Sequence, residues 1–235
     1  MAKANWTCVS RYAAPNGWVV STTLPHSATH CLTQKGPPVG QLPARSRMFY
    51  TASPSLVNSR ITAWIRIPGG GTNPSQYFVS FLHRVSNIDA VVPGSEWRIT
   101  NGYQINIRCG NAGITNPTAA QSVLMSVWKN SAYPALNNFS LLTAYAPFGP
   151  FATIVNADTA WQKWRCSVRT EFGNQVIRVE HWNGTTWDVW YQYEDNGSHQ
   201  VTAGGYCGLE LRTDVATPGG DSKVFIDDIT VESLA

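Results

Sequence analysis

The stretch from Trp164 to Asp195, WRCSVRTEFGNQVIRVEHWNGTTWDVWYQYED, predicts three antiparallel β-strands joined by two tight turns. Asn183-Gly184 is typical of a type I′ hairpin, whose two central residues need positive φ, and Phe172-Gly173-Asn174 supplies a second short reversal. Because the turns fix which residues face each other across the strands, they also fix which side chains share a face of the sheet.

This register predicts one buried face and one exposed face. Closing the second hairpin at Asn183-Gly184 places Val179 opposite Asp188 and Ile177 opposite Trp190. The face expected in the core carries Trp164, Cys166, Val168, Ile177, Val179 and Trp190. The face expected outside carries Arg165, Ser167, Arg169, Val176, Arg178, Glu180, Trp187, Val189 and Tyr191. We therefore expect a charged outer surface that also presents aromatic side chains.

Strand signals continue along the rest of the chain, and no long segment shows a helical period. In SRITAWIRI, the apolar residues from Ile61 to Ile67 alternate with Arg60, Thr62, Trp64 and Arg66, as in a strand with one buried face. Further strands are predicted at Trp6–Arg11, Trp18–Thr22, Arg47–Thr51, Gln76–Arg84, Tyr103–Cys109, Ser122–Trp128, Phe139–Ala144, Tyr206–Arg212 and Lys223–Glu232. The sequence predicts one all-β domain over residues 1–235, with residues 1–57 as irregular edge strands and loops that wrap it.

The composition limits the function classes. The 235 residues include 17 Lys and Arg, scattered and giving a formal charge of only +3, which argues against nucleic-acid binding. No apolar run is long enough for membrane insertion, and MAKANWTCVS lacks the features of a secretory signal peptide. We therefore expect the chain to be made and folded in a cytoplasm.

Several segments, in this order, resemble a known superfamily: SRITAWIRI, QYFVSFLHRVSN, GYQINIRCG, the WQKW-to-GTTW stretch, GGYCGLELRT and KVFIDDITVE. Over roughly residues 55 to 235 the chain is similar to the concanavalin A-like lectins and glucanases in their laminin-G-like jelly-roll form. The resemblance implies a two-sheet antiparallel β-sandwich. It also implies that Asp227 or Asp228 of the closing motif could help to hold a structural Ca²⁺. The alternative is that one of these aspartates bonds neighbouring backbone N–H groups. No other cofactor or metal is predicted.

The sequence shows no clear catalytic site for either enzyme class found with this fold. Glycoside hydrolases of this superfamily carry an E-x-D-x-x-E motif, which is absent here. The adjacent acidic pairs, Glu194-Asp195 and Asp227-Asp228, point to opposite faces of a strand and cannot flank one bond. A polysaccharide lyase needs a base beside residues that neutralise a uronate, which Tyr191 with Arg178 and Arg169, or Gln104 with Arg108, could supply. Arginines on an exposed sheet face also pair with carboxylates without any substrate, so we predict no catalytic residue.

The outer face is the best candidate for binding. Sugars stack on aromatic rings while charged side chains bond their hydroxyl groups, but aromatic residues with arginine are equally typical of a protein interface. Both interpretations remain open. The predicted binding residues are Trp64, Arg165, Arg169, Arg178, Glu180, Trp187 and Tyr191.

A jelly roll usually works outside a cell, whereas this sequence shows no export signal. A virion protein, folded in the host cytoplasm and exposed after lysis, meets both conditions. We therefore predict a non-enzymatic structural or adhesive protein of a phage-like virion, such as a capsid decoration, tail or fibre component. Its expected partners are other virion proteins, further copies of itself as a homo-oligomer, and a cell-surface glycan. The alternatives are a soluble carbohydrate-binding module or lectin, and a polysaccharide lyase or glycoside hydrolase.

Overall fold

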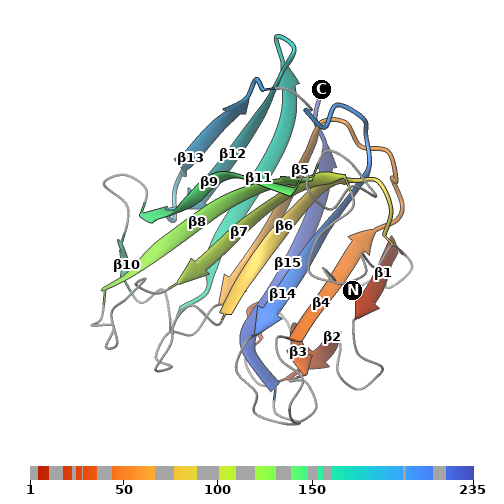
Figure 1. Cartoon of the computed structure of the whole chain (residues 1–235). Helices are drawn as coiled ribbons and strands as arrows, with labels where there is room; N and C mark the ends of the chain where they lie inside the picture. Colours follow the sequence, from red (N-terminus) through yellow and green to blue (C-terminus); the bar gives the residue numbers. More distant parts are fainter. Residues whose placement is uncertain are drawn as a thin grey trace.

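The protein is a β-sandwich of two antiparallel sheets, which Figure 1 shows as two layers facing each other. The computed structural model describes residues 5–10, 18–22, 25–27, 29–35, 44–66, 77–88, 101–109, 120–130, 139–147, 153–155, 160–197, 200–213 and 221–235. In this part of the chain no helix has the length and apolarity needed to span a membrane. The predicted two-sheet, all-β jelly roll is confirmed.

The first layer is an eight-stranded sheet. Its spatial order is β1 (Trp6–Ser10), β4 (Ala44–Tyr50), β14 (Tyr206–Thr213), β6 (Tyr77–Val85), β7 (Gly102–Cys109), β8 (Ala120–Asn130) and β10 (Thr153–Val155), with β9 (Phe139–Pro147) also paired to β8. The second layer is a seven-stranded sheet. Its spatial order is β13 (Trp187–Asp195), β12 (Asn174–Trp182), β11 (Gln162–Glu171), β5 (Ser59–Arg66), β15 (Asp221–Ser233), β3 (Cys31–Lys35) and β2 (Trp18–Ser21).

The strands predicted from alternation are all found, with shifts of a few residues at their ends. The predicted positions Arg11, Ile67 and Gln76 lie outside the described residues. Two short strands, β3 and β10, were not predicted. Within the first 57 residues, β1 and β2 lie at the edges of the two sheets, whereas β4 lies between β1 and β14.

The main hydrophobic core fills the space between the layers. Each sheet contributes alternate residues, as the period-2 pattern requires. They include Val79, Phe81, Ile105, Ile107, Val127 and Leu209 from one sheet and Ile61, Ala63, Ile65, Cys166, Val168, Ile177 and Val179 from the other, all fully buried. The predicted core face of the Trp164–Asp195 segment is therefore confirmed.

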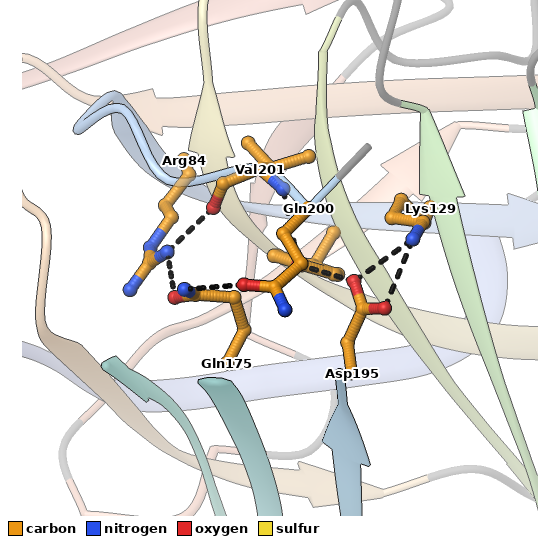
Figure 2. A network of polar contacts seen from close by, with 7 residues as sticks. Arg84, Lys129, Gln175, Asp195, Gln200 and Val201 are labelled. Atoms are coloured by element: carbon orange, nitrogen blue, oxygen red, sulfur yellow. Dashed lines mark hydrogen bonds and ion pairs between the residues drawn. The ribbon is translucent and has the colours of Figure 1, made fainter. Parts of the chain in front are cut away.

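A buried polar network also lies between the layers and joins them (Figure 2). Lys129 of β8 places Nζ 3.0 and 2.9 Å from the two carboxylate oxygens of Asp195 in β13, and the hydroxyl of Tyr103 donates to the same carboxylate at 2.7 Å. Arg84 donates to the side chain of Gln175 and, at 2.5 Å, to the carbonyl oxygen of Val201. Burial, together with the bond to Asp195, raises the pKa of Tyr103. These partners satisfy groups that would otherwise be costly to bury.

Candidate functional site

The outer face of the seven-stranded sheet brings most of the predicted binding residues together. Burial alternates strictly along β5, where Trp64 points away from the core. Strand pairing sets Lys163 opposite Trp64 and Arg165 opposite Thr62, so these two residues of β11 share the outer face. Strand pairing also sets Trp182 opposite Trp187. We call the four residues Trp64, Lys163, Trp182 and Trp187 the aromatic row. All four are partly exposed.

The ammonium group of Lys163 lies among three indole rings. Its Nζ atom is 5.6 Å from the ring centroid of Trp64, 5.9 Å from that of Trp182 and 5.7 Å from that of Trp187. These distances are within the usual range of cation–π attraction. The row therefore joins strands β5, β11, β12 and β13 through one central cation.

A charged pair flanks the aromatic row. Arg165 and Glu180 face each other on β11 and β12, and their two N–H···O bonds measure 2.6 and 2.7 Å. The guanidinium carbon of Arg165 lies 4.2 Å from the ring centroid of Trp187. This two-pronged geometry holds the guanidinium in a fixed plane against the indole.

A loop segment covers one end of the row. The imidazole of His26 stacks on Trp64 with 4.0 Å between ring centroids, and it meets Trp161 edge-on at 5.5 Å. Asp227 holds this segment, since its carboxylate accepts from the backbone N–H of His26 at 3.2 Å and of Ser27 at 3.4 Å.

The predicted calcium position can be compared with this geometry. Asp227 also accepts from the backbone N–H of Asp228 at 2.9 Å, so its oxygens bond three backbone groups. This is the alternative role that the sequence left open. Within the described residues no group of three or more His, Cys, Asp or Glu side chains could hold a metal ion. A calcium ion near Asp227 or Asp228 stays a prediction.

Six of the seven predicted binding residues lie on the outer face, in two sets. Trp64, Arg165, Glu180 and Trp187 lie together. Arg178 and Arg169 share the outer face but lie farther along the strands, where Arg178 donates to Gln192 at 2.9 Å and Arg169 pairs with Glu171 at 3.5 Å. Lys163, Trp182 and His26 were missed as site residues. The alternation of Lys163 with the core residue Trp164 could have placed Lys163 on the outer face. For His26, no pattern in the neighbouring sequence predicted a place in the site.

The predicted position of Tyr191 on the outer face is wrong, because Tyr191 is buried in the core. The hairpin closes with a bond from the Asn183 N–H to the Thr186 carbonyl, so its central residues are Gly184 and Thr185 and the predicted turn at Asn183-Gly184 is wrong. The predicted pairing of Val179 with Asp188 and of Ile177 with Trp190 is wrong as well. The register also shifts between Val179, which pairs with Tyr191, and Glu180, which pairs with Val189. Trp190 is the extra residue of this bulge, and a bulge reverses the facing of every residue beyond it.

The type I′ turn lies in the other hairpin. Phe172 and Gly173 have φ values of 50° and 85°, between the paired residues Glu171 and Asn174. Both central residues therefore take the positive φ that this turn requires. The short reversal predicted there is confirmed.

The outer face of the eight-stranded sheet carries a different row. Successive strand pairs align Arg47, Glu210, Ser80, Asn106 and Ser126 across five strands. We call these five residues the polar row. Arg47 Nε lies 2.5 Å from Glu210 Oε2, Ser80 donates to Asn106 at 2.6 Å, and Asn106 donates to Ser126 at 3.1 Å. All but Arg47 are nearly or fully buried.

Two amides stand at alternate positions of β7 on this face. Gln104 donates to Ser80 at 3.2 Å and to the oxygen of Asn106 at 3.0 Å. A retaining hydrolase needs a carboxylic acid and a carboxylate about 5 Å apart; Glu210 beside Gln104 is one carboxyl group, and the amides of Gln104 and Asn106 cannot supply the second. For a lyase, Tyr191 lies in the core and not beside Arg178 and Arg169, and the side chain of Arg108 lies outside the described residues.

The strongly perturbed titratable groups lie in the interior. Burial lowers the pKa of His83 to about 3 and that of His181 to about 4, and it raises the pKa of Cys207 to about 11. His83 bonds Ser59 at 2.8 Å within the core. Since these groups are buried, their pKa shifts report on the stability of the fold and do not identify a reaction site.

Comparisons with known proteins agree with this geometry at the level of the fold. No protein-family model matches the sequence, and no curated protein is significantly similar to it. Among solved structures, the glycoside hydrolase family 16 endo-glucanase from Bacteroides ovatus, in complex with G4G3G-2F-DNP, aligns with a TM-score of 0.60 at 13% identity, covering 99% of this chain and 96% of that one.

Two carbohydrate-binding structures align similarly. The Emp46p carbohydrate recognition domain in its potassium-bound form gives a TM-score of 0.57 at 12% identity, covering 98% of this chain and 89% of that one. The VIP36 exoplasmic/lumenal domain in its Ca²⁺/Man3GlcNAc-bound form gives a TM-score of 0.53 at 12% identity, covering 100% of this chain and 86% of that one. Identities this low show a shared fold, and the predicted concanavalin A-like jelly roll is confirmed.

Proposed function

We propose that this chain, whose fold is that of the concanavalin A-like lectins and glucanases, is a non-enzymatic carbohydrate-binding protein. The observation that carries the proposal is the aromatic row. It places three partly exposed tryptophans beside a charged pair on one open sheet face. Aromatic faces with adjacent hydrogen-bonding groups are what sugar recognition requires.

In the proposed complex, the apolar C–H face of a pyranose stacks on the part of Trp187 or Trp64 that Arg165 and His26 leave uncovered. The Arg165–Glu180 pair is fixed in place before a ligand arrives, so little side-chain entropy is lost when its groups bond hydroxyls. Asn183 and Asp188 bond each other at 3.0 and 3.1 Å next to Trp187 and add polar groups at the rim. A glycan can therefore find both stacking and hydrogen bonds along the row.

The fold neighbours support the general class of ligand. Two of them are described as carbohydrate-bound or as a carbohydrate recognition domain, and a third as an endo-glucanase. The amides of Gln104 and Asn106, and the burial of Tyr191, favour binding without catalysis.

We also propose the virion role that the sequence suggested, as an assembly or adhesive component made in a host cytoplasm. A partly exposed aromatic surface with arginine favours protein contacts as well as glycan contacts. Incorporation of the chain into particles tests this role. Assembly that continues unchanged without the chain, with no chain found in purified particles, would contradict it.

A glycan array tests the binding proposal. We expect Trp187→Ala to weaken binding by about 2 kcal/mol, or roughly 30-fold, because it removes a central stacking anchor. Phe172→Ala is the matched control, since Phe172 is a fully exposed aromatic at a hairpin tip outside the row. The proposal is wrong if the folded wild-type chain binds no glycan, or if both variants bind as tightly as wild type.

A further inference from the structure

Lys163, on the outer face of the seven-stranded sheet, has no anionic partner, whereas three arginines of the same face do. Arg165 pairs with Glu180, Arg60 lies 3.5 Å from Glu232, and Arg169 lies 3.5 Å from Glu171. Within the described part of the chain, no carboxylate lies within ion-pair distance of Lys163, and no acceptor lies within hydrogen-bonding distance. Its positive charge is therefore available to an anionic ligand.

The surroundings of Lys163 make this charge effective. The indoles of Trp64, Trp182 and Trp187 flank the ammonium, and their faces attract a cation without supplying an anionic oxygen to bond its N–H groups. Charge interactions strengthen where apolar groups displace water. An anion that reaches Nζ between the rings would therefore gain more than one that meets a solvated lysine.

Nearby carboxylates do not take this position, because each has another partner. Glu180 bonds Arg165, Asp188 bonds the amide of Asn183, and Asp227 accepts from backbone N–H groups. The positions of these acids are thus fixed, and the charge of Glu180 is neutralised.

We infer that Lys163 binds the anionic substituent of an acidic saccharide, a carboxylate or a sulfate, whose ring stacks on Trp64 or Trp187. This inference rests on the proposed glycan binding at the same row and names its ligand class. The stacked ring supplies the position, and the ammonium supplies a charge-assisted hydrogen bond that a neutral sugar cannot accept as strongly. The aromatic row is then selective for acidic glycans.

Matched oligosaccharides test the inference on the full chain. One pair is a galacturonate hexamer and its methyl ester, and the other is a galactan hexamer and its sulfated form. We expect the wild-type chain to bind at least one acidic member roughly 10-fold more tightly than its neutral counterpart, which is the size of one charge-assisted bond. The pair that shows the preference distinguishes carboxylate from sulfate.

Two variants assign the preference to Lys163. Lys163→Gln should abolish it while neutral binding persists. Arg178→Gln removes one positive charge from the same face, at a residue that donates to Gln192, and should retain the preference. Two results overturn this inference alone, provided that Trp187→Ala still weakens binding. One is equal affinity for both members of each pair, and the other is a preference that survives in Lys163→Gln. Absence of binding to all four probes overturns it together with the proposed function.

Discussion

The two outer faces of the sandwich each carry a row of side chains across several strands, but only one row is open. The aromatic row on the seven-stranded sheet is partly exposed, and its central cation has no anionic partner among the described residues. The polar row on the eight-stranded sheet is richer in hydrogen-bonding groups, yet Glu210, Ser80 and Ser126 are fully buried. Accessibility, and not the number of polar groups, therefore separates a candidate binding surface from an internal network.

This difference has an energetic basis. Groups of the polar row bond each other, so a ligand would have to replace bonds that already exist. One acceptor of this face, Oε1 of Gln104, lacks a hydrogen-bond partner in the described structure, but the atom is buried and does not face solvent. On the aromatic row, stacking and anion binding displace mainly water.

The largest expected effect tests whether the polar row is structural. Glu210→Gln removes the charge that Arg47 meets at 2.5 Å in a fully buried position. We expect the free energy of unfolding to fall by about 3–5 kcal/mol, the usual cost of breaking a buried pair. Glu232→Gln, at the exposed pair with Arg60, should change it by less than about 0.5 kcal/mol. If urea titrations gave both variants a similar loss of unfolding free energy, the pair in the polar row would be no more structural than the exposed pair.

Acid should destabilise the protein through its buried histidines and not through the aromatic row. Burial, and then the charge of Arg84, lower the folded-state pKa of His83 to about 3 from 6.5. The unfolded chain therefore binds the proton first, so this stability is fully present above pH 6.5 and is lost as the pH falls toward 3. At pH 5 the loss is about 2 kcal/mol for this group. Burial lowers the pKa of His181 to about 4, so His181 also destabilises the fold as the pH falls.

Urea titrations at pH 7 and pH 5 check this expectation. His83→Gln should lose about 2 kcal/mol less than wild type between these pH values, since it has no imidazole to protonate. Lys163→Gln is the control from the aromatic row and should keep the wild-type pH dependence. A pH dependence unchanged in His83→Gln would show that this buried imidazole does not set the acid sensitivity.

A smaller effect concerns the charged pair beside the aromatic row. Arg165 and Glu180 are bonded twice but keep 19% and 7% of their side-chain surfaces exposed. We expect a coupling energy of about 1 kcal/mol from a double-mutant cycle of Arg165→Met and Glu180→Met. The same cycle at Arg47 and Glu210 should give a larger value, because that pair is more deeply buried. The reverse order would contradict the assignment of open and closed faces.

The smallest effect concerns the hairpin tip, which belongs to neither row. Phe172 takes a positive φ of 50° with its side chain fully exposed, so its ring gains no packing there. Asn adopts this conformation more readily in type I′ turns. We expect Phe172→Asn to stabilise the chain by about 0.5 kcal/mol, raising the melting temperature by roughly 1–2 °C, with glycan binding unchanged. Weakened binding would place the site at the tip.

Sequence periodicity predicted the fold and much of the outer face, because alternation reports directly which side of a strand is buried. It placed Val179 and Cys166 in the core and Trp64 and Arg165 outside, as observed. The failure at Tyr191 has a local cause, since an extra residue at Trp190 reverses the facing of the rest of β13. A bulge is set by side-chain packing, which the turn sequence does not encode.

Contacts between distant segments could not be predicted. His26 reaches Trp64 because Asp227 holds its backbone, and those three residues are far apart in sequence. The polar row joins five strands, and the sequence pattern singled out polar residues on only one of them, Gln104 and Arg108 of β7. Register across non-consecutive strands, such as β14 between β4 and β6, is fixed by the whole sheet.

The most direct test compares the indole N–H signals of both faces in one NMR titration with the tightest-binding oligosaccharide of the matched set. Trp64, Trp182 and Trp187 report on the aromatic row, and Trp128, which donates to Ser126 at 3.1 Å, reports on the polar row. We predict that the signals of Trp64 and Trp187 shift with the ligand while that of Trp128 stays in place. A shift of Trp128 with the aromatic row unmoved would place the binding site on the opposite sheet and contradict the account.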